Sequence, residues 1–296
     1  MKPFLYSSLL SNAASLGVHW IYNHEKLKQI QESKSLLFLS QDEAFFNDAK
    51  PSFYVYPKNE IGQLSVQGQI LTWIYKALKE NPKFSKTDYE NLLFEKFKPG
   101  GDYQGYVESY AKKLVISKLS DELKLNLDKQ VLNDTHLVGF MPYLASKGLE
   151  IDLSVPISLL EVFTLNKDYK DYLEMFNQLF IKLELKDMKS AIIDVIKYAP
   201  KHEKAKFENI KEFKNIDDYI NAYAGRACSI EQSVPLIFYI LYHAKSFEDA
   251  LNINVSVGGA SSDRALLLGA FLSQIYDIPN SWKEKVKKHL KEADYL

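Results

Sequence analysis

Glycine, proline and cysteine are all scarce in this chain. Its 296 residues include 12 glycines and 10 prolines, which is too little turn-forming material to connect many short strands. The composition therefore favours helices over an all-β fold. The single cysteine, Cys228, cannot form an internal disulfide, so we expect a reducing compartment and a cytoplasmic protein.

Charge of one sign and long apolar runs are also missing. The 37 lysines and arginines nearly balance the 38 aspartates and glutamates, which leaves a net charge of -1. A protein that binds nucleic acid through its phosphates carries a basic surface, so we expect no nucleic-acid partner. No window approaches the ~18 consecutive apolar residues that a membrane span requires, so we also expect no membrane partner.

Hydrophobic residues, in contrast, make up 46% of the chain, and a chain of this length buries roughly three quarters of the surface that its unfolded form exposes. No linker, low-complexity tract or fixed-period repeat interrupts the sequence, so we predict one domain over residues 1–296. The stretch from Lys2 to Gly17 faintly resembles a signal peptide. Because Ser7, Ser8 and Asn12 interrupt its apolar run, we interpret it as an amphipathic first helix.

Apolar residues recur at helical spacing over much of the chain, for example from Ile61 to Leu78. Ser85 and Asp88 form an acidic variant of a capping box, which opens a helix that Pro99, Gly100 and Gly101 end. Further helices are predicted over residues 104–119, 134–146, 154–165, 168–184 and 187–198.

The last third of the chain carries clearer helix signals. Ser229 with Gln232 forms a second capping box, and Ser246 with Asp249 opens a short helix. A polar loop over residues 254–263 then leads into an apolar helix. The ranges predicted here are Ala265 to Tyr276 for the apolar helix and Trp282 to about Leu290 for a closing, lysine-rich amphipathic helix. The one candidate strand, Phe53 to Tyr56, could equally be an ordered loop.

Several motifs carry a resemblance to a known family. In chain order, the later ones are Gly225–Pro235, Ser246–Leu251, Gly258-Gly259 and Ile278–Trp282. These resemble the C-terminal half of ADP-ribosylglycohydrolases, while Ala13–Tyr22 and Lys98–Tyr106 are similar to the branch that contains crystallin J1 of jellyfish lens. The resemblance spans almost the whole chain. It implies an all-α, single-domain orthogonal helical bundle with its site in a cleft where several loops meet.

Family members that hydrolyse ADP-ribosyl bonds hold two Mg²⁺ ions through two aspartate-rich stretches. In this sequence the first stretch aligns with Ser65-Val66-Gln67-Gly68 and the second with Ala260-Ser261-Ser262-Asp263. Mg²⁺ prefers an octahedral set of oxygen ligands that usually includes one or two carboxylates. A single aligned carboxylate does not build a pair of ions, so we expect no Mg²⁺ and no other cofactor.

The second of these stretches is nevertheless a candidate ligand site. Gly258 and Gly259, with the residues up to Ser262, resemble a backbone nest whose free amides would bind phosphate at a helix N-terminus. Asp263 and Arg264 follow at the start of the helix, where an aspartate either provides acid–base help or only caps the helix. Candidate ligand contacts in the two stretches are Ser65, Gln67, Gly258, Gly259, Ser261, Ser262 and Arg264.

Other candidates come from the remaining motifs. His19 is a candidate general base beside Trp20, or else a packed core pair. The Gly100-Gly101-Asp102-Tyr103 loop lines the cleft if the resemblance holds, and Tyr103 and Tyr106 would stack on a base or sugar or fill the core. Glu161 is a candidate acid that is either buried or on the surface. Asp134 and His136 are interpreted as part of a helix N-cap rather than as a site.

Three functions are consistent with these observations. The first is a metal-independent hydrolase of an ADP-ribosyl, nucleotide or glycosidic substrate, with Asp263, His19 or Glu161 as acid–base groups. The second is a ligand-binding protein that has lost hydrolysis, and the third is a structural, crystallin-like protein. The first two imply a small-molecule partner such as ADP-ribose or a related nucleotide or sugar. An enzyme should bring at least two ionisable groups together in one place.

Overall fold

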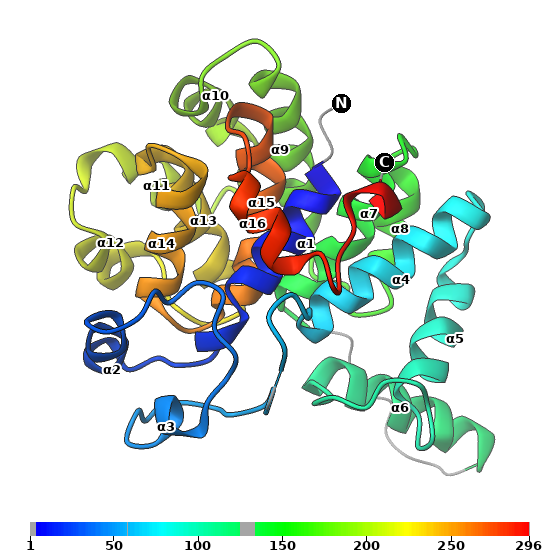
Figure 1. Ribbon diagram of the computed structural model, residues 1–296. Coiled ribbons are helices and arrows are strands. Elements are labelled where there is room, and N and C mark those ends of the chain that lie inside the picture. Colours follow the sequence, from blue (N-terminus) through cyan, green and yellow to red (C-terminus); the bar gives the residue numbers. More distant parts are fainter. Residues whose placement is uncertain (1–3, 58, 125–133, 296) are drawn as a thin grey trace.

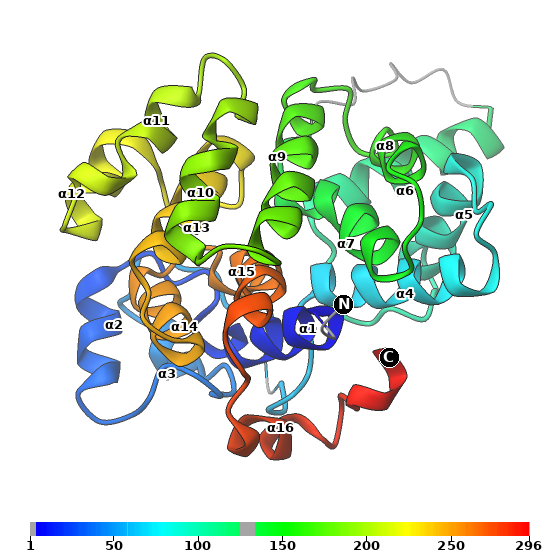
Figure 2. The same cartoon turned by 90° about the horizontal axis from the view of Figure 1, so that it is seen from above.

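The molecule is a bundle of helices arranged around one central pair. The computed structural model describes residues 4–57, 59–124 and 134–295, so Lys2 lies outside the described part of the chain. Helices α1 (Phe4–Ala14) and α15 (Ser261–Ile275) lie side by side at the centre (Figures 1 and 2). Within the described residues there is no strand, but two isolated bridges pair Ile21 with Ser52 and His136 with Ser229. The predicted all-α fold class is confirmed.

The central pair is buried on every side. All eleven residues of α1 are buried, polar ones included, so the prediction of an amphipathic first helix was wrong. Close approach of the two helices depends on Gly269 of α15, because a Cβ atom there would lie 2.5 Å from both Ser11 Oγ and the Ser7 carbonyl oxygen. The small polar residues that interrupt the apolar run of α1 therefore face a neighbouring helix, where small side chains allow the backbones to pack tightly.

The other helices surround this pair. Helix α4 packs on α7, α14 packs on α15, and α10 packs on α9 and α13. Their bounds are α2 His24–Gln31, α3 Glu43–Phe46, α4 Val66–Glu80, α5 Lys86–Phe97, α6 Ser109–Glu122, α7 Met141–Gly148, α8 Ser154–Leu160, α9 Asp168–Leu183, α10 Met188–Val195, α11 Lys204–Glu208, α12 Ile216–Tyr223, α13 Ile230–His243, α14 Phe247–Val257 and α16 Asn280–Val286. Short 3₁₀ helices are η1 Leu16–Val18, η2 Leu137–Phe140, η3 Ile196–Tyr198, η4 Ile210–Glu212 and η5 Glu292–Tyr295.

Most predicted helices are present, with ends displaced by a few residues. The capping box of Ser85 and Asp88 forms at the start of α5, and the Ser246 side chain accepts a hydrogen bond from the backbone of Asp249 at the start of α14. The second predicted capping box was wrong. Ser229 precedes α13 but makes no side-chain cap bond, because the Gln232 carbonyl turns back to accept from the Ala227 amide at 3.2 Å.

Two predicted loop and strand boundaries were also inaccurate. Helix α14 continues to Val257, and α15 already begins at Ser261, so the predicted loop over residues 254–263 shrinks to residues 258–260. Phe53 to Tyr56 form an ordered loop and not a strand; the neighbouring bridge is made by Ser52. None of the described helices combines the length and the apolar character needed to cross a membrane.

Candidate functional site

The N-terminal ends of four helices converge on one buried cluster of polar side chains. Ser65 precedes α4, Glu108 precedes α6, and Asp263 lies in the first turn of α15. The start of α13 joins them because the Ile230 amide donates to the Thr135 carbonyl at 2.8 Å. Each helix N-terminus carries a partial positive charge and backbone amides that lack partners within the helix. The cluster therefore lies where anionic side chains and polar ligands are favoured.

Asn12 of α1 joins two of these helix ends directly. Its side-chain amide nitrogen donates to Ser65 Oγ at 2.8 Å and to the Ser262 carbonyl at 2.9 Å, while its carbonyl accepts from the Ser65 amide at 2.9 Å. The side chain is fully buried. Ser262 Oγ in turn donates to the backbone carbonyl of Asn12 at 2.9 Å. A single asparagine thus fixes the start of α4 against the start of α15.

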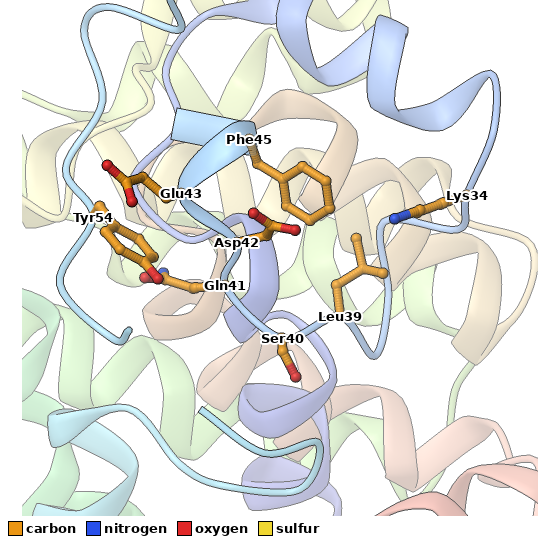
Figure 3. Close-up of a pocket in the computed structure, with 8 residues that line it drawn as sticks. All are labelled: Lys34, Leu39, Ser40, Gln41, Asp42, Glu43, Phe45 and Tyr54. Atoms are coloured by element: carbon orange, nitrogen blue, oxygen red, sulfur yellow. The ribbon is translucent and has the colours of Figure 1, made fainter. Parts of the chain in front are cut away.

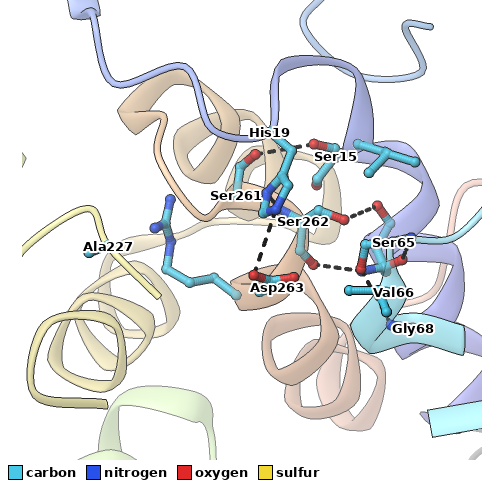
Figure 4. A network of polar contacts seen from close by, with 12 residues as sticks. Ser15, His19, Ser65, Val66, Gly68, Ala227, Ser261, Ser262 and Asp263 are labelled. Atoms are coloured by element: carbon cyan, nitrogen blue, oxygen red, sulfur yellow. Dashed lines mark hydrogen bonds and ion pairs between the residues drawn. The ribbon is translucent and has the colours of Figure 1, made fainter. Parts of the chain in front are cut away.

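His19 and Asp263 face each other inside the cluster. His19 Nε2 lies 3.7 Å from an Asp263 carboxylate oxygen, and both side chains are fully buried (Figure 4). His19 Nδ1 accepts a hydrogen bond from the Ser262 amide at 3.2 Å, which places the ring proton on Nε2, toward Asp263. Burial, assisted by the nearby charge of Arg264, lowers the pKa of His19 to about 3.

These contacts correct the expectation that His19 is a general base. A neutral imidazole has one free lone pair, and in His19 that lone pair is occupied by the Ser262 amide. The ring can donate from Nε2 but cannot take a second proton without breaking the bond that orients it. His19 is therefore a positioning residue that directs an N–H group at Asp263.

Asp263 is paired electrostatically with a second buried carboxyl, that of Glu108. Burial is the main cause that raises the pKa of both groups, and each side chain is almost or completely inaccessible to solvent. The charge of Asp263 raises the pKa of Glu108 further, whereas His136 and Arg264 partly counteract the rise at Asp263. Asp263 consequently ionises before Glu108, and Glu108 holds its proton more firmly.

A histidine supported by a carboxylate completes this group. His136 Nδ1 lies 2.5 Å from Asp134 Oδ1, and the same oxygen accepts from the His136 amide at 2.8 Å. The cap prediction is only partly correct: His136 is the N-cap residue of the 3₁₀ helix η2, but the Asp134 carboxylate bonds the amide and the imidazole of His136 rather than a backbone amide inside that helix. The cationic form of His136 lowers the pKa of Asp263, so the ring lies within electrostatic reach of the buried pair.

Many polar atoms of the cluster have no hydrogen-bond partner among the described residues. These atoms are Asp263 Oδ1 and Oδ2, Glu108 Oε1, His19 Nε2, Tyr110 Oη, and Oε1 and Nε2 of Gln67. Gln67 approaches Glu108 from α4 and partly offsets the rise in its pKa, without completing a well-formed hydrogen bond. Buried polar groups are nearly always satisfied in native proteins, and exceptions gather at functional sites. The unmatched donors and acceptors mark this cluster as a place for a polar ligand.

The glycine loop beside the cluster does not provide free amides. The amides of Gly259, Ala260, Ser261 and Ser262 donate to the Ile21 carbonyl, the Arg226 carbonyl, the Gly259 carbonyl and His19 Nδ1. The expected phosphate-binding nest was therefore wrong. Gly258 and Gly259 both have positive φ, and a Cβ atom on Gly259 would lie 2.0 Å from the Arg226 carbonyl oxygen. These glycines let the loop pack against the chain after Gly17.

Arg264 is a structural residue rather than a ligand contact. Its guanidinium is fully buried and donates to Asn254 Oδ1 at 3.0 Å, to the Arg226 carbonyl at 3.1 Å and to the Gly258 carbonyl at 2.5 Å. Ser261 and Ser262 are likewise engaged, because their hydroxyls donate to the carbonyls of Ser15 and Asn12. The sequence places these residues correctly beside Asp263, but their polar atoms hold the loop together.

An aromatic group lies next to His19. The rings of His19 and Trp20 stack with centroids 5.0 Å apart, and Trp20 contacts Phe53 and Tyr106 edge-on. Phe53 is 55% exposed and Tyr106 is 38% exposed, so this aromatic group connects the buried cluster with the surface. Trp20 has a φ of 67°, which is an unusual backbone conformation for a bulky residue and is found most often at functional sites.

The loop of Gly100, Gly101, Asp102 and Tyr103 is only partly connected to this group. The Tyr103 hydroxyl donates to the Tyr106 carbonyl at 3.0 Å, but its ring packs edge-on against Trp73 and Phe97. Asp102 is exposed and forms an ion pair with Lys96 at 2.8 Å. A Cβ atom on Gly101 would clash with the Lys96 carbonyl at 2.4 Å, while one on Gly100 would meet open space. The loop positions Tyr106 and carries no acid–base group.

Glu161, the third acid–base candidate, lies elsewhere. It ends α8, its side chain is 41% exposed, and its carboxylate lies 3.7 Å from Lys86 Nζ. Because Glu161 is exposed and paired with a lysine at the surface, it is not part of the buried cluster.

A hollow near α3 is also separate from the buried cluster (Figure 3). Its Gln41 side chain donates to the carbonyls of Leu16 and His19 and accepts from the Tyr56 amide, so it supports the His19 loop from behind.

The donor set does not fit the two Mg²⁺ ions that the resemblance implies. Val66 offers no ligand, Ser65 Oγ is bonded to Asn12, and the hydroxyls of Ser261 and Ser262 are donated to backbone carbonyls. Asp263 is the one carboxylate among the aligned positions. No group of three or more histidine, cysteine, aspartate or glutamate side chains among the described residues is arranged to hold a metal ion. The chemistry below is therefore derived without a metal.

Sequence reasoning missed Glu108, Asn12 and the pairing of Asp134 with His136. Glu108 stands between Val107 and Ser109 near the start of a helix. Because charged residues at helix starts are usually exposed, the sequence does not indicate that Glu108 is buried. Asn12 interrupts an apolar helix, and that polar interruption was a usable signal of a buried hydrogen-bonding role. For Asp134, the spacing to His136 was visible, but nothing in the sequence places that dyad near Asp263.

Comparisons with known proteins agree with this arrangement at the level of the fold. No family model matches the sequence. A 102-residue segment, 34% of this chain, is 28% identical to Crystallin J1A of Tripedalia cystophora and spans 29% of the length of that protein. A solved structure described as an ADP-ribosylglycohydrolase-related protein complex superimposes with a TM-score of 0.64 at 10% identity, covering 99% of this chain and 95% of the other. The chain has the fold of ADP-ribosylglycohydrolase-related proteins, and the resemblance predicted from the motifs is confirmed to that extent.

Proposed function

We propose that this chain is a metal-independent hydrolase of a glycosidic bond in an ADP-ribosyl, nucleotide or related sugar substrate, with Glu108 and Asp263 as its acid–base pair. One observation carries the proposal: two buried carboxyls, Glu108 just before α6 and Asp263 in the first turn of α15, both have pKa values raised by burial, and the charge of Asp263 adds to the rise at Glu108. Glycoside hydrolysis ordinarily uses two carboxyl groups, one protonated and one ionised.

The environments of the two groups assign their roles. Glu108 keeps its proton, because burial and the charge of Asp263 both raise its pKa, and it is the general acid that protonates the leaving group. Asp263 ionises more readily, because Arg264 and His136 lie nearby, and it is the base that takes a proton from the attacking water. The neutral Nε2–H of His19 faces the Asp263 carboxylate at 3.7 Å, which is close enough for electrostatic attraction but longer than a hydrogen bond.

The substrate would enter beside the aromatic group of Trp20, Phe53 and Tyr106. Partly exposed rings bind the faces of nucleobases and sugars through stacking and apolar contact, and Lys112 Nζ lies 4.8 Å above the Tyr106 ring. The unpaired atoms of Gln67 and Tyr110 would bind hydroxyl groups of the substrate, since both a donor and an acceptor are available there.

A second candidate is a ligand-binding protein without turnover. The unpaired polar atoms of Gln67 and Tyr110 favour it, because a ligand can bond to them without any proton transfer by Asp263 or Glu108. Binding would then use the same unpaired atoms, and the carboxyls would serve recognition alone.

Two measurements test the proposal. ADP-ribose is titrated calorimetrically into the protein, and release of ADP-ribose from an ADP-ribosylated protein is followed, each once with excess Mg²⁺ and once with a chelator. Equal binding and equal turnover in both conditions support metal-independent hydrolysis. Turnover with Mg²⁺ alone would overturn it, binding without turnover supports the second candidate, and neither binding nor turnover rejects both for this substrate.

A further inference from the structure

A second cavity is lined by residues of α10, η3, α11, η4 and α13. Figure 2 shows α10, α11 and α13 on one side of the bundle. Its volume is about 330 Å³, within the range of small-molecule sites. Its lining residues are Ile192, Ile193, Ile196, Lys197, Lys204, Phe207, Glu208, Ile210, Lys211 and Tyr242. The proposed hydrolase chemistry uses none of them.

The lining separates into an apolar floor and a basic rim. Ile192, Phe207 and Ile210 are buried beneath the cavity, and Ile193, at its edge, is 52% exposed. An apolar floor that reaches the surface through an exposed isoleucine is suited to a ligand with an apolar body.

The charged side chains of the lining are three lysines and one glutamate, which leaves an excess of two positive charges. Glu208 pairs with Lys204 at 3.4 Å. Lys211 has an exposed partner in Glu212 at 3.8 Å. Lys197 lies 5.1 Å from the Tyr198 ring, and its charge contributes to the lowered pKa of Asp194, whose carboxylate is paired with Lys186 at 2.5 Å. Lys197 is therefore available to an anion at the mouth of an apolar cavity.

We propose that this cavity binds a small amphipathic carboxylate, with an alkyl chain over Ile192, Phe207 and Ile210 and its carboxylate at Lys197. A cavity of about 330 Å³ lies at the small end of the range for ligand sites, which suits a short carboxylate such as octanoate. Burial of the alkyl chain against the apolar floor favours binding, and the basic rim favours a ligand with a negative charge.

Octanoate is the probe, and isoleucine methyl resonances of the full-length protein are the readout. Titration should shift the methyl signals of Ile192, Ile193, Ile196 and Ile210 and leave that of Ile116 on α6 unchanged. Octan-1-ol, which has the same chain but no charge, should bind more weakly. Lys197→Gln should raise the Kd for octanoate about two- to fivefold, as expected for one exposed ion contact, and the matched exposed variant Lys113→Gln should not change it.

Three outcomes would overturn the inference: no shift of the four cavity isoleucines, equal affinity for octan-1-ol and octanoate, or an unchanged Kd in Lys197→Gln. Because Lys197 and Lys113 are both exposed, their glutamine variants test binding without disturbing the buried core. The same titration on Asp263→Asn separates the two sites, since octanoate binding should persist there whether or not the hydrolase proposal holds.

Discussion

His19 Nε2 lies 3.7 Å from an Asp263 carboxylate oxygen, and neither side chain is accessible to solvent. The two residues are 244 positions apart in the chain and meet because the loop after η1 packs against the start of α15. The contact joins a neutral donor to a carboxyl that resists ionisation. The properties of this pair, and of Glu108 beside it, lead to four predictions.

Glu108→Gln and Asp263→Asn should each lower the rate of glycosidic hydrolysis by about 10²- to 10⁴-fold, the usual contribution of a general acid or base. The amides keep the shape of the side chains but cannot transfer a proton. Rates measured at saturating substrate test this, with Asp102→Asn as a matched control on an exposed carboxylate. A rate within threefold of the unmodified protein for either buried variant would remove that residue from the mechanism.

The raised pKa of Asp263 makes the protein less stable as pH rises. The folded state holds a proton that the unfolded chain releases above its ordinary pKa near ~4, so the free energy of unfolding should fall with increasing pH from there up to the raised value. In Asp263→Asn this loss should be smaller. Urea unfolding at pH 5, 7 and 9 provides the comparison, and identical pH profiles for the two proteins would contradict the raised pKa.

The lowered pKa of His19 has the opposite effect on the pH dependence of stability. Its pKa is about 3 in the folded protein, below the ordinary value of 6.5, so the unfolded state takes up a proton first and stability is lost as pH falls below 6.5. Between pH 6.5 and pH 5 this group should remove about 2 kcal/mol from the free energy of unfolding. His19→Asn keeps an acceptor for the Ser262 amide and should not show this loss. Equal acid sensitivity of both proteins would indicate that the ring is protonated in the folded state.

Asn12→Ala should destabilise the protein by about 2–4 kcal/mol, because it removes three buried hydrogen bonds and leaves the Ser65 amide without its acceptor. Ser8→Ala on the same helix removes a buried hydroxyl that has no partner among the described residues, and it should be neutral or stabilising. Thermal unfolding of the two variants measures the difference. If both cost the same, the asparagine would be merely a packed side chain rather than a tie between α4 and α15.

The sequence alone determined the all-α fold, most of the helices and the absence of carboxylates from the stretch Ser65-Val66-Gln67-Gly68. Helices follow from local signals such as the capping box of Ser85 and Asp88, which acts within one turn. The absence of a carboxylate at a position can also be seen in the sequence alone, because the side chain of Val66 has no oxygen to bind a metal in any fold. Asp263 could be named as a candidate site residue from the sequence because its position relative to Gly258 and Gly259 is fixed along the chain.

Tertiary structure decided which of these residues keep unpaired polar atoms in the buried cluster and which form the hydrogen bonds that hold the fold. Glu108 is buried because α6 begins against the starts of α4 and α15, and its pKa depends on Asp263, 155 positions away. The amides of the glycine loop are occupied because the chain near Ile21 and Arg226 packs against them. Burial, tautomer and hydrogen-bond partners depend on residues distant in sequence, and a single sequence read for its local patterns does not contain them.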